Sequence, residues 1–325
     1  MKNFAWLLIF VIAFTACSNE QKNQPKNEAN AISGNLTIFH AGSLSVPMKE
    51  IAAAFEKENP NVKVLLEAAG SKACARKISD LKRECDIMAS ADYKVIENML
   101  MPEWADWCIK FATNEMTIVY SEKSKYANQI NKDNWYEILM KKDVAFGRSD
   151  PNADPCGVRA AFMMQLAEKF YNKKGLFNSM IVKDEKYIRP KETDLLALLE
   201  SGSIDYIFIY KSVAAQHNLK SLILPDEVNL KNADLASYYE TVSYETNGTK
   251  PGEKITEKAE PIVYGITIPK NAVNTTAAIA FMDFFLNREK GLKIIEQNAQ
   301  ISIITPATSN YEKVPALIQK YLKAK

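Results

Sequence analysis

Apolar runs and amphipathic stretches alternate along most of the chain. Runs rich in β-branched residues predict strands, and stretches with an apolar residue every three or four positions predict the helices between them. The predicted strands are Leu36–Phe39, Val62–Glu67, Ile87–Ser90, Ala112–Tyr120, Val144–Gly147, Ile204–Tyr210 and Ile262–Ile268. The predicted helices are Met48–Glu58, Ala73–Arg83, Tyr93–Met99, Trp135–Leu139, Gly157–Lys173, Leu195–Ser201 and Thr275–Asn298. This alternation predicts an α/β fold with mostly parallel sheets, each buried between helices.

The length of the chain favours two lobes, because about 290 residues exceed what one core usually supports. Two extended runs, near Ala112–Tyr120 and Ile262–Ile268, are long for ordinary strands and bracket the middle of the chain. We expect them to be hinge crossings between the lobes. Residues 34–116 and 265–325 would then form lobe I, and residues 117–264 lobe II. The polar segment Tyr239–Lys258 is expected to be a mobile surface segment.

The N-terminus resembles a bacterial export signal. Lys2 precedes an apolar run from Phe4 to Phe14, which is too short for an ordinary spanning helix and ends at Ala16-Cys17. Residues 1–16 are predicted to be a signal peptide, Cys17 to be lipidated, and residues 17–33 to be a disordered tether. An uncleaved anchor with an incidental cysteine is the alternative. This reading places the protein in the cell envelope as an exported, membrane-anchored lipoprotein.

Charge and cysteine content exclude several classes of partner. The chain has 41 Lys and Arg against 39 Asp and Glu, so no field of one sign favours nucleic acid. Beyond Cys17 the cysteines are Cys74, Cys85, Cys108 and Cys156. They form no CxxC pair, which argues against zinc, and their spacing chooses no disulfide pairing, so we expect some buried free thiols. No cofactor is predicted.

Two turns rich in small residues follow predicted strands. The run Ala41–Ser45 contains Gly42 and Ser43, and the run Glu67–Lys72 contains Gly70 and Ser71. Each lies where a strand passes into a helix, and free amide groups and hydroxyls at a helix N-terminus bind anions. Serine is also a common N-cap, an alternative that either turn alone leaves open. Together the turns suggest a small, charged, oxygen-rich ligand.

Two acidic residues lie at similar positions in the middle of the chain. Asp154, followed by Pro155 and Cys156, comes directly before a predicted helix, and Glu192 lies in a polar loop before another. Asp154 is also explained as an N-cap, and Glu192 as a solvated loop residue. An enzyme is not predicted: the chain contains no nucleophile elbow, GxGxxG, P-loop or HExxH motif, and Cys156 has no evident basic partner.

Six segments in order, between about Leu36 and Pro306, resemble the tungstate/molybdate-binding proteins of ABC importers. They are AGSLSVPMKEI, EAAGSKACARKI, DIMASADY, GRSDPNADPCG, KETDLLALLESGSIDYIFIY and PIVYGITIPKN. The resemblance implies a two-lobed, type II periplasmic-binding-protein fold, a monomer, and a permease in the membrane as partner. It also implies that the oxyanion is bound between the lobes by Gly42, Ser43, Ser71, Asp154, Pro155, Cys156, Glu192 and Tyr210.

In this family Asp154 and Glu192 would bind the metal centre directly. Carboxylates facing a dianion are costly in a dry site unless their oxygens complete six-fold coordination of molybdenum or tungsten, which sulfur and phosphorus do not accept. A carrier for sulfate, phosphate or ferric iron is the alternative. Two positions depart from the family pattern: Val158 replaces an expected tyrosine, and Ala299 an expected glycine.

Overall fold

The computed structural model describes residues 32–183, 185–250 and 252–323. The predicted signal peptide, Cys17 and nearly all of the predicted tether lie outside these residues. No helix in the described part of the chain is both long enough and apolar enough to cross a membrane.

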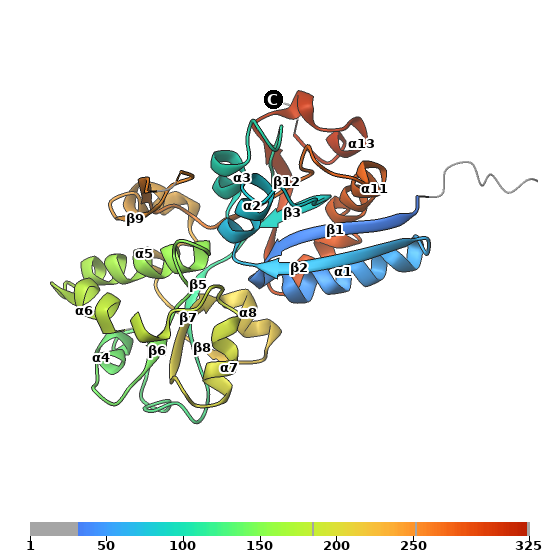
Figure 1. The fold of residues 1–325 in the computed structure, drawn as a ribbon. Coiled ribbons are helices and arrows are strands. Elements are labelled where there is room, and N and C mark those ends of the chain that lie inside the picture. Colours follow the sequence, from blue (N-terminus) through green and yellow to red (C-terminus); the bar gives the residue numbers. More distant parts are fainter. Residues whose placement is uncertain (1–31, 184, 251, 324–325) are drawn as a thin grey trace, which may run out of the picture. The chain divides into compact units, whose positions relative to one another are not determined.

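One sheet has six strands in the order β12-β4-β11-β3-β1-β2. β2 and β3 both pair in parallel with β1, whereas β11 is antiparallel to β3 and β4, and β12 is antiparallel to β4. The strands are β1 (Gly34–Ala41), β2 (Val62–Ala69), β3 (Ile87–Ser90), β4 (Ile109–Thr113), β11 (Val263–Thr267) and β12 (Ile301–Thr308). The helices beside it in Figure 1 are α1 (Ser45–Glu58), α2 (Ser71–Ser79), α3 (Tyr93–Met99), α11 (Thr275–Leu286), α12 (Gly291–Gln297) and α13 (Ala316–Gln319).

A second sheet has four strands in the order β6-β7-β5-β8. β5 is antiparallel to β7 and β8, and β6 is parallel to β7. The strands are β5 (Met116–Tyr120), β6 (Phe146–Gly147), β7 (Tyr206–Tyr210) and β8 (Lys220–Ser221). The helices in this part of the chain are α4 (Trp135–Leu139), α5 (Pro155–Phe170), α6 (Leu176–Lys183), α7 (Asp194–Glu200), α8 (Lys211–Gln216), α9 (Asp226–Asn229) and α10 (Ala236–Tyr239).

Two sheets flanked by helices confirm the predicted two-lobed α/β fold, but the prediction of mostly parallel sheets is wrong. Both sheets are mixed. The cause lies where the chain crosses between them. It leaves the first sheet after β4 and returns through β11, and these two strands pair antiparallel. Only strands joined by a crossover helix are parallel.

The predicted strand Ala112–Tyr120 is two strands in two different sheets. β4 ends at Thr113 and β5 begins at Met116, and only Asn114 and Glu115 separate them. The return crossing, predicted at Ile262–Ile268, is β11 and belongs to the six-stranded sheet. The lobe limits given by the sequence remain a prediction.

Tyr239–Lys258, predicted to be a mobile surface segment, contains an antiparallel hairpin, and its mobility stays a prediction. β9 (Ser243–Asn247) pairs along its whole length with β10 (Lys254–Lys258), and β9 packs on α5. Gln165 Nε2 on α5 donates to the Ser243 carbonyl at 2.8 Å. The ladder and this contact give the polar segment regular structure.

Cys74, Cys85, Cys108 and Cys156 are all buried and free, which confirms the expectation of buried thiols. Burial raises the pKa of Cys74 to about 12 and that of Cys156 well above its usual value. None of the four is therefore ionised near neutral pH.

Candidate functional site

The candidate residues lie at the ends of strands in both sheets, all of them buried. Gly42 and Ser43 follow β1 in a short 3-10 helix (Gly42–Leu44), and Ser71 follows β2 as the first residue of α2. Tyr210 is the last residue of β7. Asp154, Pro155 and Cys156 form the start of α5, and Glu192 lies two residues before α7. Ligands of open α/β proteins bind at such strand ends.

Asp154 combines the capping role with a second contact. Its Oδ1 accepts the Cys156 N–H at 3.0 Å, as an N-cap of α5 with Pro155 in the first turn. Its Oδ2 accepts the Glu192 N–H at 3.0 Å. The Asp154 side chain therefore holds the loop that carries Glu192 against the start of α5.

Glu192 is not a solvated loop residue. Its side chain is 1% exposed, and neither carboxylate oxygen has a hydrogen-bond partner among the described residues. It packs so closely on Gly42 that a Cβ at that position would lie 2.7 Å from Oε2. Burial, and then the charge of Asp154, raises the pKa of Glu192 well above its ordinary value.

Neither serine is a helix cap. No side chain caps the 3-10 helix, α1 or α2. Ser43 Oγ lies 2.9 Å from Tyr264 Oη, and Ser71 Oγ accepts the Ala91 N–H at 3.0 Å. The capping alternative is therefore wrong for both serines, whereas the capping reading of Asp154 is correct.

Tyr210 is held by a buried arginine. Arg159, 3% exposed, donates through Nη1 to Tyr210 Oη at 2.6 Å and to the Ala91 carbonyl at 2.7 Å. Its Nη2 lies 3.3 Å from Asp92 Oδ2. Burial raises the pKa of Tyr210 well above its usual value, so the hydroxyl keeps its proton.

These contacts close a ring that joins the strand ends of both sheets. Ser43 contacts Tyr264, whose ring packs on Tyr210 with centroids 6.0 Å apart. Tyr210 leads through Arg159 and Ala91 to Ser71. The other half of the ring starts at Gly70, next to Ser71, which packs on Asp154, and continues through Glu192 to Gly42. The structure thus brings the predicted serines, carboxylates and tyrosine into one buried cluster.

Three members of this cluster were not predicted from the sequence. Tyr264 lies within a strand predicted only as a hinge, and Arg159 is the fifth residue of α5. Asn114 lies between β4 and β5, and its Nδ2 donates to Tyr264 Oη at 2.9 Å. Arg159 carries the one usable signal, because an arginine three positions after Cys156 follows the site motif along one helix face. Tyr264 contacts a residue 221 positions away, which no local pattern indicates.

Across the same region, α2 lies against the loop before α5. The Ala73 N–H donates to the Ala153 carbonyl at 3.1 Å, and Lys72 Nζ donates to the Pro151 carbonyl at 3.1 Å. Lys72 Nζ also lies 2.5 Å from Glu257 Oε1 on β10. Helices and loops of the two sheets therefore meet directly beside Ser71 and Asp154.

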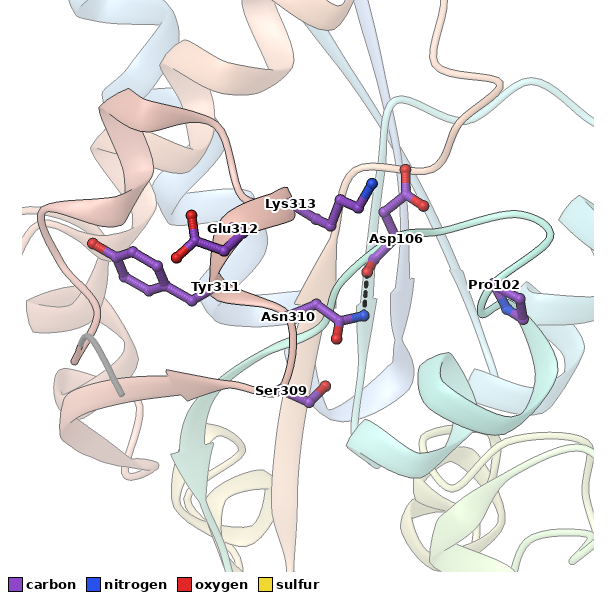
Figure 2. A pocket seen from close by; sticks show the side chains of 7 residues that line it. All are labelled: Pro102, Asp106, Ser309, Asn310, Tyr311, Glu312 and Lys313. Carbon is purple, nitrogen blue, oxygen red and sulfur yellow. Dashed lines mark hydrogen bonds between the residues drawn. The ribbon is translucent and has the colours of Figure 1, made fainter.

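One cavity lies away from this cluster, and another borders it. One, of about 560 Å³, is formed by Pro102, Asp106 and residues 309–313, and contains no candidate residue (Figure 2). The other, of about 540 Å³, lies between α3, α5 and the β9–β10 hairpin, with Pro155 and Arg159 in its wall. No group of three or more His, Cys, Asp or Glu residues suited to a metal ion occurs in the described ranges.

The fold is that of a solute-binding protein. Residues 36–298 match the family described as bacterial extracellular solute-binding protein, and the chain belongs to it. An uncharacterized solute-binding protein of Petrotoga mobilis is 50% identical over 296 residues, covering 91% of this chain and 92% of that protein. The molybdate/tungstate-binding protein WtpA of Pyrococcus abyssi is 43% identical, covering 92% and 93%. These matches confirm the family resemblance and the prediction that the chain is not an enzyme.

Solved structures support the same fold. The periplasmic molybdate-binding protein of Azotobacter vinelandii aligns with a TM-score of 0.61 at 16% identity, covering 82% of this chain and 98% of that one. The sulfate-binding protein SubI of Mycobacterium tuberculosis aligns with a TM-score of 0.57 at 12% identity, covering 88% and 90%. At these identities the two structures show the fold and do not distinguish the ligand.

Proposed function

We propose that this protein is the substrate-binding lipoprotein of an ABC importer and that it binds molybdate or tungstate between its lobes. The observation that carries the proposal is the Glu192 carboxylate, which is buried beside Asp154 and whose oxygens have no hydrogen-bond partner among the described residues. Two relatives named molybdate/tungstate-binding protein WtpA, at 43% and 42% identity, support it.

When both of its groups are ionised, a buried acidic pair needs an electron-pair acceptor, because two carboxylates without one repel each other and lose hydration. The metal centre of molybdate or tungstate is such an acceptor and expands from four to six oxygen ligands. Asp154 and Glu192 would supply the two added ligands. The Asp154 oxygens each accept one backbone N–H, which leaves a lone pair on each for the metal.

The remaining candidate residues surround the oxyanion as donors. Ser43, Ser71 and Tyr210 offer hydroxyl protons, and Gly42 leaves room for the Glu192 carboxylate. Pro155 has no N–H, and the Cys156 N–H donates to Asp154, so these two residues act by placing Asp154. The same carboxylates would repel sulfate and phosphate, whose central atoms offer no added coordination.

The proposed cellular context follows from the N-terminal sequence. Lipidation at Cys17 and the tether to residue 33 would hold a monomer at the cell envelope beside the permease. Labelling with a radioactive fatty acid tests this part independently of binding. Loss of label in Cys17→Ala is expected, and label retained in that variant would contradict it.

Calorimetry with tungstate, molybdate, sulfate, phosphate and ferric citrate tests the ligand. Molybdate and tungstate are expected to bind one per chain and to raise the melting temperature, because a ligand of the native state stabilises it by mass action. Sulfate and phosphate should give no heat at the same concentrations. Equal binding of sulfate would overturn the six-coordinate site, and binding of ferric iron alone would replace it with an iron carrier.

A further inference from the structure

Two hydroxyl groups of the site, those of Ser71 and Tyr210, are held by partners that donate and do not accept. A hydroxyl has one proton and two lone pairs, so a partner that only donates occupies a lone pair and leaves the proton for another acceptor. Ser71 Oγ accepts the Ala91 N–H, and Tyr210 Oη accepts from Arg159. Neither a backbone N–H nor a guanidinium reverses this direction.

Ser43 also accepts a hydrogen bond, and two further residues, Asn114 and Tyr264, set its direction. Asn114 Oδ1 accepts the Glu115 N–H at 2.9 Å, which fixes the orientation of the amide. Its Nδ2 therefore donates, at 2.9 Å to Tyr264 Oη and at 2.8 Å to Ser212 Oγ. The Tyr264 oxygen accepts from Asn114, and its proton has one acceptor among the described residues, Ser43 Oγ at 2.9 Å.

The reverse arrangement is unfavourable. If Ser43 donated to Tyr264, the buried Tyr264 proton would have no acceptor in the described part of the chain, and an unsatisfied buried donor is costly. Tyr264 therefore donates to Ser43, and the Ser43 proton is left without a protein acceptor.

We propose that Asn114, through Tyr264, and Arg159 are positioning residues that direct the protons of Ser43 and Tyr210 toward a bound oxyanion. With Ser71, this gives three hydroxyl donors preset before the ligand arrives, which lowers the cost of ordering them on binding. The inference rests on the proposed oxyanion function and adds to it residues that touch no ligand. Asn114 lies between β4 and β5, so the chain of donors begins at the crossing between the sheets.

Asn114→Asp should reverse the direction of the hydrogen bonds that run from residue 114 through Tyr264 to Ser43. An aspartate has nearly the same shape but only accepts, so Tyr264 would donate to it and Ser43 would donate to Tyr264. The Ser43 proton is then lost to the ligand. We expect molybdate affinity to fall by about tenfold or more, the range for a hydrogen bond to a charged partner.

Tyr264→Phe separates this effect from simple charge repulsion. Without the Tyr264 hydroxyl the reversal is not transmitted, so Asn114→Asp should cost at most about twofold in the Tyr264→Phe background. Tyr239→Phe removes the hydroxyl of another fully buried tyrosine away from the site and is the control for the loss of a tyrosine hydroxyl and its hydrogen bonds. If Asn114→Asp weakens binding equally with and without Tyr264, the added charge is the cause and the proposal for this arm is wrong.

Arg159→Lys tests the second arm while keeping the positive charge. One ammonium group does not reproduce the planar fork in which Nη1 holds Tyr210 Oη and the Ala91 carbonyl while Nη2 lies beside Asp92 Oδ2, so binding should weaken. In a Tyr210→Phe background the further loss should vanish. Additive losses of affinity in the double variant would contradict the role of Arg159, and melting curves identify any variant that unfolds.

Failure of the proposed function and failure of this inference are distinguishable. If the wild-type protein binds neither molybdate nor tungstate, the proposed function is refuted. If the wild type binds normally but the losses in both double variants are additive, only the positioning role of Asn114, Tyr264 and Arg159 is refuted.

Discussion

The carboxylate of Glu192 lies directly on the Cα of Gly42, 150 positions earlier in the chain. A Cβ added at Gly42 would be 2.7 Å from Oε2 and 2.9 Å from Oε1. Only glycine leaves this space, and no positive φ angle is recorded there. The glycine is therefore required by the neighbouring carboxylate and not by the backbone turn.

Gly42→Ala should abolish oxyanion binding and leave the protein folded. The new methyl group would displace the end of a flexible side chain, which costs little for the fold but moves Glu192 out of the site. Calorimetry with molybdate and a melting curve measure the two effects. Gly248→Ala is the matched control, because its Cβ would also meet a glutamate, Glu253, outside the cluster. Normal molybdate binding by Gly42→Ala would remove Glu192 from the site.

Glu192→Gln should change how the stability of the ligand-free protein depends on pH. The pKa of Glu192 is raised in the folded protein, so the folded state holds a proton that the unfolded state has lost. Wild-type stability should therefore fall as the pH rises from the ordinary pKa of a glutamate, about 4.3, through the raised pKa. Glutamine does not titrate, so the stability of the variant should not fall in this way. Urea unfolding across a pH series measures the difference, and parallel curves for the two proteins would contradict it.

The sequence predicts the fold best where hydrophobic pattern and turn chemistry agree. The run Leu36–Phe39 followed by Gly42 and Ser43 indicates a strand and a tight turn, and β1 ends at Ala41. At Asn114 and Glu115 the hydrophobic pattern does not indicate that one strand ends and another begins, because apolar residues continue on both sides of the break. β12 is hidden for another reason: it contains Pro306, which is tolerated because β12 lies at the sheet edge.

The site could be predicted only in part, for a physical reason. Residues in strand-to-helix turns, such as Ser71 and Asp154, stand out because their local sequence is distinctive. Arg159 and Tyr264 act through contacts 51 and 221 positions away in the sequence. No local periodicity records such pairs, so their roles emerge only when the two sheets are brought together.

Asp154→Asn and Asp154→Ala should separate metal binding from helix capping. Asparagine keeps one acceptor and caps helices about as well as aspartate, whereas alanine loses the cap at a cost of about 1 kcal/mol. Both variants should lose molybdate binding, because neither has a carboxylate. Only the alanine variant should lose the full capping energy in urea unfolding. Wild-type affinity in the asparagine variant would show that the Asp154 charge is not a ligand.

Ala299→Gly should stabilise the protein without changing its affinity. Ala299 directly follows Asn298, the C-cap residue of α12. Its φ angle is 60°, which is the left-handed conformation in which glycine is favoured. This explains the glycine that is expected there from the family pattern. We expect a gain of about 1 kcal/mol, measured by urea unfolding. Ala299→Val is the opposing control and should be less stable than the wild type. A glycine variant less stable than the wild type would exclude backbone strain at this position.

Lys72 and Arg76 lie one turn apart on α2, and their side chains contact segments attached to the other sheet. Lys72 Nζ contacts the Pro151 carbonyl, Thr246 and Glu257, and Arg76 donates to the Asn152 carbonyl at 2.7 Å. These contacts are lost if the lobes separate, so they should slow ligand release more than they speed capture.

Lys72→Met should therefore raise the dissociation rate of molybdate, by about tenfold, with a nearly unchanged association rate. Stopped-flow fluorescence measures both rates. Lys77→Met is the control, because Lys77 on the same helix pairs with Glu67 of β2, within its own sheet, and its loss should leave release unchanged. We propose that the lobes close about the predicted hinge crossings, so small-angle scattering should show a smaller radius of gyration with molybdate in the wild type. Equal release rates in both lysine variants would mean that Lys72 contributes charge to α2 and does not hold the lobes together.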